Sequence, residues 1–493
     1  MQKLYKNHPE VGWDGRQSLT GEKGRDKSQA HRPNVAVLGA GFGGLWAART
    51  LADGPVNVLL IDRHNYHTFF PLLYQVGAAE LEPEDITQPL RKIFWKRSNV
   101  RFFLGEVQGV DLSAKVVRIP DHEIRYDYLV IALGSKPNFY AVPGLAEHAF
   151  TLKSVEQGIA LRNQILTCFE RAACEVDLGL RQAWLTFTIV GGCPTGVEFA
   201  GALMELIRGS LDKDFPNLDF KQVRILLLEA SDHLLNGTPK ELSDYTQKRL
   251  RKMGVDVQLK SHLVKITPRE VFLEDGTRIS SRTVIWTAGV SGNIPGDQWG
   301  LATNRLNQVE VLPTLQVPGH PEVYIAGDLA GIQQDGHPLP MVAQMGIQTG
   351  STAARNILRQ VTGRTPLPFR YHDKGTLDVI GRNAAVAHIW GRAFRGFSAW
   401  LIWVWVHIFN LIGYRNRFLV LIDWAWDYFF SEHTVRLIFP SEIPPGKGRT
   451  ATEVPDKADV LVGVDTPKEA GREMIFSDEL DGKVQHGEMR ASI

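Results

Sequence analysis

Gly39-Ala40-Gly41-Phe42-Gly43-Gly44 is the stretch of this sequence that decides its fold. The apolar run 35–38 comes directly before it, and a stretch with helical character continues to residue 51. In that setting a GxGxxG pattern permits a tight turn, a close approach of the backbone to a pyrophosphate, and close packing of helix on strand. Asp62 follows the next apolar run, 56–61, where a carboxylate can accept hydrogen bonds from a ribose. These features predict a βαβ unit that binds a dinucleotide through Gly39, Gly41, Gly43, Gly44 and Asp62; the alternative is a glycine-rich turn with a surface aspartate.

A second copy of this pattern occupies residues 186–229. The apolar run 186–190 leads into Gly191-Gly192-Cys193-Pro194-Thr195-Gly196, a helical stretch follows near 197–207, and the run 223–228 ends at Glu229. Cys193 stands where the middle glycine belongs, so we expect its side chain to crowd the pyrophosphate. Glu229 suits the two ribose hydroxyls of NADH, whereas the 2′-phosphate of NADPH would meet a like charge. Gly191, Gly196 and Glu229 thus predict an NADH site; the alternative is a relic fold that no longer holds a nucleotide.

The order of the strands predicts that the second unit is inserted in the first. Apolar runs at 128–135 and 284–290 each look like the last strand of one fold, and 323–326 runs into Gly327-Asp328 and returns to the first fold. We therefore expect an α/β protein with two Rossmann-like dinucleotide-binding domains and C-terminal amphipathic membrane-anchoring helices. The predicted boundaries are a disordered tail at 1–33, a first dinucleotide domain at 34–150 and 315–368, a second at 151–314, a membrane-associating region at 369–440 and a disordered tail at 441–493.

Composition excludes several classes of function. Among 493 residues, 55 Lys and Arg balance 54 Asp and Glu, so no global field draws the protein to nucleic acid. The three cysteines, Cys168, Cys174 and Cys193, form no CxxC and no metal-ligand spacing, so we expect no metal site and a reducing compartment. No closely spaced cysteine pair follows the first glycine loop, and a disulfide reductase would need such a dithiol beside its flavin.

The region from 397 to 430 is rich in aromatic residues and predicts contact with a membrane surface. Its apolar stretches, 397–412 and 418–430, are shorter than the roughly 18 to 20 residues that cross a bilayer, and the basic segment 413–417 lies between them. We expect two helices lying in the interface, with Arg415 and Arg417 on lipid phosphates and with Asp423 and Asp427 on a wet face. The alternative is a buried helical hairpin that closes a soluble dimer. The aromatic anchors would be Trp400, Trp403, Trp405, Trp424 and Trp426.

From residue 34 to 438 the sequence resembles the type II NADH:quinone oxidoreductases, single-chain NADH dehydrogenases that do not pump protons. The motifs that carry the resemblance are GAGFGGL (39–45), HTFFPLLYQV (67–76), DYLVIALGS (127–135), TGVE (195–198), YIAGD (324–328), AQMGIQ (343–348) and DKGTLDVIGR (373–382). The resemblance implies FAD in the first domain, NADH as substrate in the second, and a membrane quinone as electron acceptor. It further implies a homodimer held as a peripheral protein on the lipid bilayer surface, at the cytoplasmic face of a bacterial inner (plasma) membrane.

The resemblance also assigns individual residues. Asp328 is similar to a ligand of the FAD ribityl or phosphate region, although it could instead cap the segment that follows. Gln344 and Gln348 would line the quinone pocket, where amides can donate to quinone carbonyls, although such glutamines are often merely solvated. Glu198 would support proton delivery, or else stabilise a helix N-terminus. Tyr74 belongs to a segment that we expect to pack against the flavin.

Two rival functions remain at this point. A sulfide:quinone oxidoreductase would share the flavin domain and the amphipathic end, but its reaction needs cysteines that flank the flavin. A membrane-bound flavoprotein redox sensor would have its NAD site disabled by Cys193.

Overall fold

A six-stranded sheet carries the first glycine loop. The computed structural model describes residues 32–430 and 435–439, so nearly all of the tails predicted at 1–33 and 441–493 lies outside the described residues. The central strands are parallel and buried on both faces, which explains their continuous apolar runs. β21 pairs in parallel with β9, so the chain returns to the first sheet after the second unit, which confirms the predicted insertion. In order the strands are β20 (Gln316–Val317), β21 (His320–Ile325), β9 (Tyr128–Ile131), β1 (Asn34–Leu38), β2 (Asn57–Asp62) and β5 (Val100–Leu104).

A four-stranded parallel sheet carries the second glycine loop. Its central strand, β11 (Thr186–Val190), has the predicted bounds, and helix α7 (Pro194–Leu206) follows the loop and continues into one π-helical turn. The order is β13 (Asp256–Gln258), β12 (Arg224–Leu228), β11 and β17 (Thr283–Trp286), and the surrounding helices include α5 (Val155–Cys174), α6 (Leu178–Trp184) and α9 (Lys240–Met253).

Shorter elements connect and cover these two sheets. Their bounds are β3 (Tyr66–Thr68), α2 (Leu73–Gly77), β4 (Thr87–Pro89), α3 (Leu90–Ile93), β6 (Gly109–Asp111), β7 (Val116–Ile119), β8 (His122–Arg125), β10 (Ser135–Pro137), α4 (Leu145–His148), α8 (Asp212–Asp214), β14 (Leu263–Ile266), β15 (Glu270–Leu273), β16 (Arg278–Ser280), β18 (Val290–Gly292), β19 (Val309–Glu310), β22 (Ala330–Gly331), β23 (Gln333–Gln334) and β24 (His337–Pro338).

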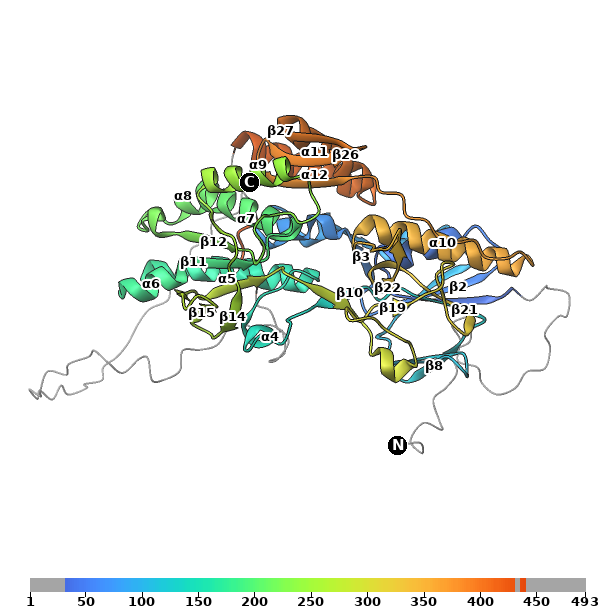
Figure 1. Cartoon of the computed structure of the whole chain (residues 1–493). Helices are drawn as coiled ribbons and strands as arrows, with labels where there is room; N and C mark the ends of the chain where they lie inside the picture. Colours follow the sequence, from blue (N-terminus) through green and yellow to red (C-terminus); the bar gives the residue numbers. More distant parts are fainter. Residues whose placement is uncertain (1–31, 431–434, 440–493) are drawn as a thin grey trace, which may run out of the picture. The chain divides into compact units, whose positions relative to one another are not determined.

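The C-terminal region contains a sheet that the sequence analysis did not predict. Strands β25 (Thr376–Gly381), β26 (Ala384–Ile389) and β27 (Arg392–Gly396) form an antiparallel meander that packs beside α11 (Phe397–Asn410) and α7. Figure 1 shows β26 and β27 gathered with α11 and α12 (Tyr414–Phe430) at one end of the structure. The segment 369–440 is therefore not wholly a membrane-associating region, because its first half forms part of the protein core.

The two predicted C-terminal helices are present, but the basic segment between them differs from expectation. The helix α12 begins at Tyr414, so residues 414–417 form its first turn rather than a connecting loop. Arg417 donates from Nε to the Leu411 carbonyl (2.7 Å) and from Nη2 to the Phe409 carbonyl (2.7 Å), so it closes the end of α11 instead of facing lipid phosphates. None of the helices in the described residues has the length and apolar character that a membrane span needs.

The faces of α12 are also reversed relative to the prediction. Asp423 and Asp427 are half-buried, and Asp427 lies 3.6 Å from Arg382, so the expected wet face of acids is wrong. The outward side is apolar instead, and α11 presents a matching outward row at four-residue intervals. The outward side chains, with their exposed fractions, are Phe397 (53%), Leu401 (48%), Trp405 (72%) and Phe409 (64%) on α11, and Phe418 (64%), Leu421 (43%), Ile422 (45%), Trp426 (46%), Phe429 (76%) and Phe430 (56%) on α12. We call these ten side chains the apolar face.

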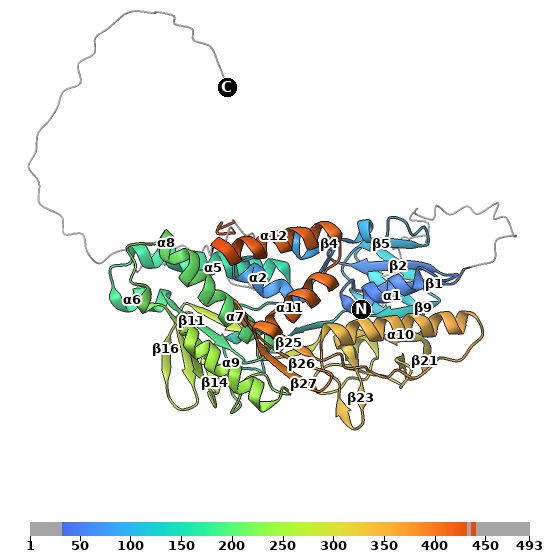
Figure 2. The same ribbon diagram turned by 90° about the horizontal axis from the view of Figure 1, so that it is seen from above.

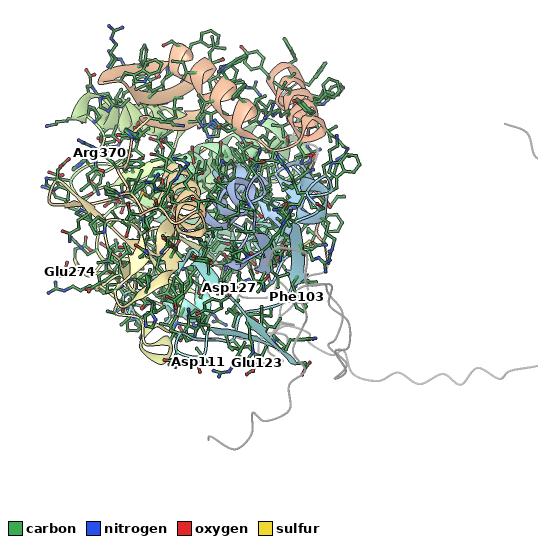
Figure 3. The ribbon with its side chains drawn as sticks, turned by 90° about the vertical axis from the view of Figure 1, so that its right-hand side faces the viewer. Phe103, Asp111, Glu123, Asp127, Glu274 and Arg370 are labelled. Atoms are coloured by element: carbon green, nitrogen blue, oxygen red, sulfur yellow. The ribbon has the colours of Figure 1, made fainter. Side chains whose placement is uncertain are left out.

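The opposite end of the molecule is charged. On the sheet β6–β8, Arg118 lies 3.3 Å from Asp111 and 3.2 Å from Glu123. Figure 3 shows Asp111 and Glu123 at the end away from the helices α11 and α12. The apolar face and this charged sheet therefore lie at opposite ends of the described structure.

Glycines allow the elements around the site to approach closely. At Gly350 of α10 (Ala343–Val361), a Cβ would overlap the Gly43 carbonyl oxygen of α1 (Phe42–Leu51), and Figure 2 shows these helices side by side. At Gly201 of α7, a Cβ would overlap the Ile380 carbonyl oxygen of β25. The second contact holds β25 against the helix that follows the second glycine loop.

Replacing Gly201 by Ala should destabilise the protein, because the added methyl group must separate α7 from β25. Overpacking of this kind costs about 1 to 3 kcal/mol. Thermal unfolding should show a clear drop in Tm for Gly201→Ala. The matched control is Gly109→Ala on β6, where the nearest atom to an added Cβ is 3.9 Å away, and we expect it to leave Tm nearly unchanged. Equal Tm values for the two variants would contradict the close-packing argument.

Candidate active site

One cavity of about 1740 Å³ connects the two nucleotide folds to helix α11. In the first fold, the first glycine loop and the Gly327–Leu329 turn line the cavity. In the second fold, the start of α7 and the segment 235–238 line it. Residues of α10 and β25 also contribute to its wall. Its far part is lined by α11 residues, among them Trp405, which also belongs to the apolar face. The cavity residues on α11 are Ile402, Trp405, Val406, His407 and Asn410.

The first glycine loop has the conformation that a bound pyrophosphate requires. Gly39 has a φ of +93°, and a Cβ there would overlap the Ala132 carbonyl oxygen. At Gly44 a Cβ would overlap the Gly39 carbonyl oxygen, so helix and strand could not pack. At Gly41, by contrast, no atom lies within 4 Å of an added Cβ, and this glycine lines the cavity. Its backbone is open to a ligand, as the dinucleotide pattern demands, so these residues fit FAD.

Two carboxylates, those of Asp62 and Asp328, line this cavity. Asp62 accepts hydrogen bonds from the Ala40 N–H at 2.6 Å and the His64 N–H at 2.8 Å, which fixes the glycine loop against the end of β2. Asp328 accepts a hydrogen bond from the Ser135 hydroxyl at 2.6 Å. The N-cap of its short turn is Ala326, and no side chain makes a capping bond there, so the alternative role of Asp328 as a helix cap is excluded.

The second glycine loop repeats this arrangement. Gly191 has a φ of +115°, and a Cβ at Gly196 would overlap the Gly191 carbonyl oxygen. Glu229 accepts from the Gly192 N–H at 2.6 Å and from the Ser231 N–H at 2.8 Å, as Asp62 does in the first fold. Gly191, Gly196 and Glu229 do not line the cavity themselves, but Pro194 and Thr195 of the same loop do.

The side chain of Cys193 is directed at the end of β17. Its thiol donates to the Thr287 carbonyl oxygen at 3.3 Å, and burial raises the pKa of this thiol. Our expectation that this side chain crowds the pyrophosphate assumed that it projects toward the nucleotide. The hydrogen bond to Thr287 turns it toward the sheet instead.

Glu198 and Asp378 form a buried acidic pair in the cavity wall. Glu198 lies on α7 and Asp378 on β25, and both line the cavity. Burial and, second, the charge of Asp378 raise the pKa of Glu198 well above its usual range. Burial raises the pKa of Asp378 to about 7. Burial and the nearby Asp378 therefore favour the protonated form of Glu198. Glu198 stands beyond the first turn of α7, which does not suit a role at the helix N-terminus.

Gln344 and Gln348 join α10 to the segment 372–375. Gln344 donates to the Gly375 carbonyl at 3.1 Å and accepts from the Lys374 N–H at 3.3 Å. Gln348 donates to the His372 carbonyl at 2.9 Å and accepts from its N–H at 3.0 Å. Both line the cavity, so neither is a freely solvated glutamine.

Tyr74 is buried on α2 and lines the cavity. Gln75 donates to the Tyr74 hydroxyl at 3.1 Å and accepts from the Trp424 indole N–H of α12 at 3.0 Å. The C-terminal helices are thus connected to the cavity wall by a chain of two hydrogen bonds.

Several ionisable residues of the cavity were not predicted from the sequence, among them Lys153, Asp378 and His407. Asp378 stands within the quoted motif 373–382, where a lone acid in an apolar strand was the available signal. Burial lowers the pKa of His407 to about 4, so its ring is neutral.

No cysteine lines the cavity, although all three cysteines are among the described residues. The cysteines that a sulfide:quinone oxidoreductase would need beside its flavin are therefore not in this cavity.

Two dinucleotide folds that share one cavity define a flavin-dependent pyridine-nucleotide oxidoreductase. Residues 33–350 match the family described as pyridine nucleotide-disulphide oxidoreductase, and residues 373–433 match the NDH2 C-terminal domain. A type II NADH:quinone oxidoreductase from Mycobacterium tuberculosis is 36% identical over 409 residues, which cover 80% of this chain and 88% of that protein. The chain belongs to the type II NADH:quinone oxidoreductase family.

Solved structures agree on the fold. The structure of NDH2 from Plasmodium falciparum in complex with NADH has a TM-score of 0.75 at 20% identity, and covers 83% of this chain and 100% of that one. The sulfide:quinone oxidoreductase from Aquifex aeolicus has a TM-score of 0.64 at 17% identity, with 86% and 100% covered. At these identities the likeness concerns the fold alone.

Proposed function

We propose that this protein oxidises NADH and reduces a membrane quinone through FAD held in the cavity, without pumping protons. The observation that carries the proposal is the continuity of the cavity, which runs from the open backbone of Gly41 to Trp405 on the apolar face. Bound FAD would supply the redox chemistry that links two-electron oxidation of NADH to reduction of the quinone. The protein supplies binding, orientation and exclusion of water.

Each nucleotide has its own set of residues. Gly39, Gly41, Gly43, Gly44, Asp62, Tyr74 and Asp328 would hold FAD in a domain built from residues 34–150 and 315–368. Gly191, Gly196 and Glu229 would hold NADH in residues 151–314. The Glu229 carboxylate anchors its own loop. If it also accepts hydrogen bonds from the ribose of NADH, a 2′-phosphate would be repelled.

On the acceptor side, reduction of a quinone consumes two protons. The raised pKa of Glu198 favours its protonated form, and Glu198 lines the same cavity, so it can donate one of them. Gln344 and Gln348 fix the segment 372–375 as part of the quinone-side wall, and their remaining donor capacity can meet a quinone carbonyl.

The apolar face would rest on the bilayer surface. Ten outward apolar side chains on two short helices, with the acids of α12 turned inward, fit helices that lie in the headgroup boundary. We further propose a homodimer at the cytoplasmic face of a bacterial inner membrane. The three free cysteines fit a reducing compartment.

The test is the visible spectrum of the purified protein under anaerobic conditions. A flavin spectrum should bleach on addition of NADH and return on addition of a short-chain quinone. A colourless protein that takes up no FAD would refute the proposal. A flavin that NADH fails to bleach would instead favour a redox sensor with a disabled NAD site.

A further inference from the structure

Lys153 extends into the cavity at the junction of the two nucleotide folds. It directly precedes Ser154, the N-cap of α5, whose hydroxyl accepts from the Gln157 N–H at 3.3 Å. The Gln157 side chain in turn accepts from the Lys153 N–H at 2.8 Å. These two hydrogen bonds hold the backbone of Lys153 in place at the start of α5. The side chain therefore leaves the backbone in a fixed direction, toward the cavity that it lines.

The ammonium of Lys153 has one hydrogen-bond partner, a neutral one. It donates to the Ser135 hydroxyl at 3.0 Å, and Ser135 donates to Asp328 at 2.6 Å. Within the described part of the chain, no carboxylate lies within 4.0 Å of this ammonium. An ammonium has three N–H donors, so two remain for a ligand. Asp328, one of the residues that fit FAD, is thereby connected to Lys153 through a single hydroxyl.

A purely structural role does not explain this lysine. Burial lowers the pKa of Lys153, and the charge of Asp328 opposes that effect. Desolvation of an ammonium that has no direct anionic partner costs free energy. An apolar side chain at this position would carry no such cost. Lys153 lines the same cavity as Pro194 and Thr195 of the second glycine loop, and Ser135 connects it to Asp328 of the flavin fold. A bound ligand that gains negative charge in this cavity would offset the cost of desolvating the ammonium.

We propose that Lys153 sets the reduction potential of the bound flavin. A hydride carries one proton and two electrons, so its transfer from NADH leaves NAD⁺ and adds one negative charge to the flavin. A partly buried cation in the same cavity would stabilise that added charge and make the flavin a stronger oxidant. This role rests on the proposed function only through the presence of FAD.

The experiment compares the midpoint potential of the flavin in three variants of the full-length holoenzyme, without NADH or quinone. Lys153→Gln keeps a donor for Ser135 and removes the charge, Lys153→Met removes both, and Lys153→Arg keeps the charge. For Gln and Met we expect a tenfold or larger drop in the equilibrium constant of reduction, which corresponds to about 30 mV for a two-electron couple. Lys153→Arg should remain near the parent protein.

A second readout uses sulfite, which adds to oxidised flavins and leaves a negative charge on the ring system. Its dissociation constant should rise about tenfold in the Gln and Met variants and should change little in the Arg variant. The matched control is Lys136→Met, which removes an exposed lysine next to Ser135, where solvent screens the charge. We expect its shift to be clearly smaller.

Three outcomes would overturn the proposal. A parental potential in Lys153→Gln would assign the lysine to hydrogen bonding, and an equal shift in Lys153→Arg would assign it to packing. Loss of FAD from all three variants would make it an assembly residue. Because the potential is measured without substrates, these results are separate from the NADH and quinone turnover that tests the proposed function.

Discussion

Replacing Glu198 by Gln should lower the rate of quinone reduction about 100-fold, while reduction of the flavin by NADH should change only severalfold. A positioned proton donor contributes about 10² to 10⁴ to a rate, and Gln cannot release a proton. Since Glu198 lines the cavity and burial raises its pKa, its loss should affect the step that consumes protons. Anaerobic stopped-flow measurement of the two half-reactions separates the steps.

Glu205 provides a matched control for this variant. It lies two turns further along α7, burial raises its pKa to about 7, and it does not line the cavity. Its carboxylate accepts from the Arg382 N–H at 2.5 Å, so Glu205→Gln could lower stability. It should leave the quinone half-reaction unchanged. If both variants slow that half-reaction equally, Glu198 has no special role in proton delivery.

The Glu198–Asp378 pair should also control the pH dependence of the quinone half-reaction. Glu198 is active as a donor when protonated, so the rate falls as pH rises through its pKa. The negative charge of Asp378 raises that pKa, so Asp378→Asn should lower it and move the alkaline limb of the profile to lower pH. A limb that stays in place would show that Asp378 does not act on Glu198.

Replacing Phe409, Phe418, Trp426 and Phe429 together by Ser should release the protein from lipid vesicles. These side chains are 64%, 64%, 46% and 76% exposed. Full burial of such a side chain is worth about 1.5 to 3 kcal/mol, so partial burial of four in lipid contributes roughly 4 kcal/mol, or about a 1,000-fold change in partitioning. Sedimentation with vesicles measures the effect.

Two comparisons make this result specific. Val176→Ser combined with Leu178→Ser removes two side chains that are 88% and 70% exposed around the start of α6, and we expect no change in vesicle binding. Analytical ultracentrifugation without vesicles tests the alternative of a hairpin that closes a soluble dimer. A quadruple variant that becomes monomeric but still binds vesicles would favour that alternative.

The nucleotide folds could be predicted because their signals are local. A glycine loop between an apolar strand and a helix has one conformation, and the backbone around Gly39 and Gly191 adopts it in both folds. The insertion of the second fold in the first could also be predicted, since the strand before Asp328 is an apolar run like the earlier strands of the first fold.

The features that sequence patterns missed depend on partners far along the chain. Asp427 was expected in solvent, but Arg382 lies beside it and turns that side of α12 inward. The strands β25–β27 pair only with one another in the described part of the chain, and β25 packs against α7 at Gly201, far earlier in the sequence. Lys153 carried no motif of its own, and only the fold brings it to Ser135 and Asp328.

The attachment of α12 to the flavin-binding fold has a consequence for where the protein can work. Asn416 donates to the carbonyls of Glu84, Asp85 and Thr87, and Trp424 to Gln75, so these helices cannot shift independently of the cavity. A protein that spans a bilayer must match its hydrocarbon thickness, with a cost for each ångström of mismatch. Helices that rest in one leaflet, as we propose for α11 and α12, would escape that constraint, so the same electron path would serve thick and thin membranes alike.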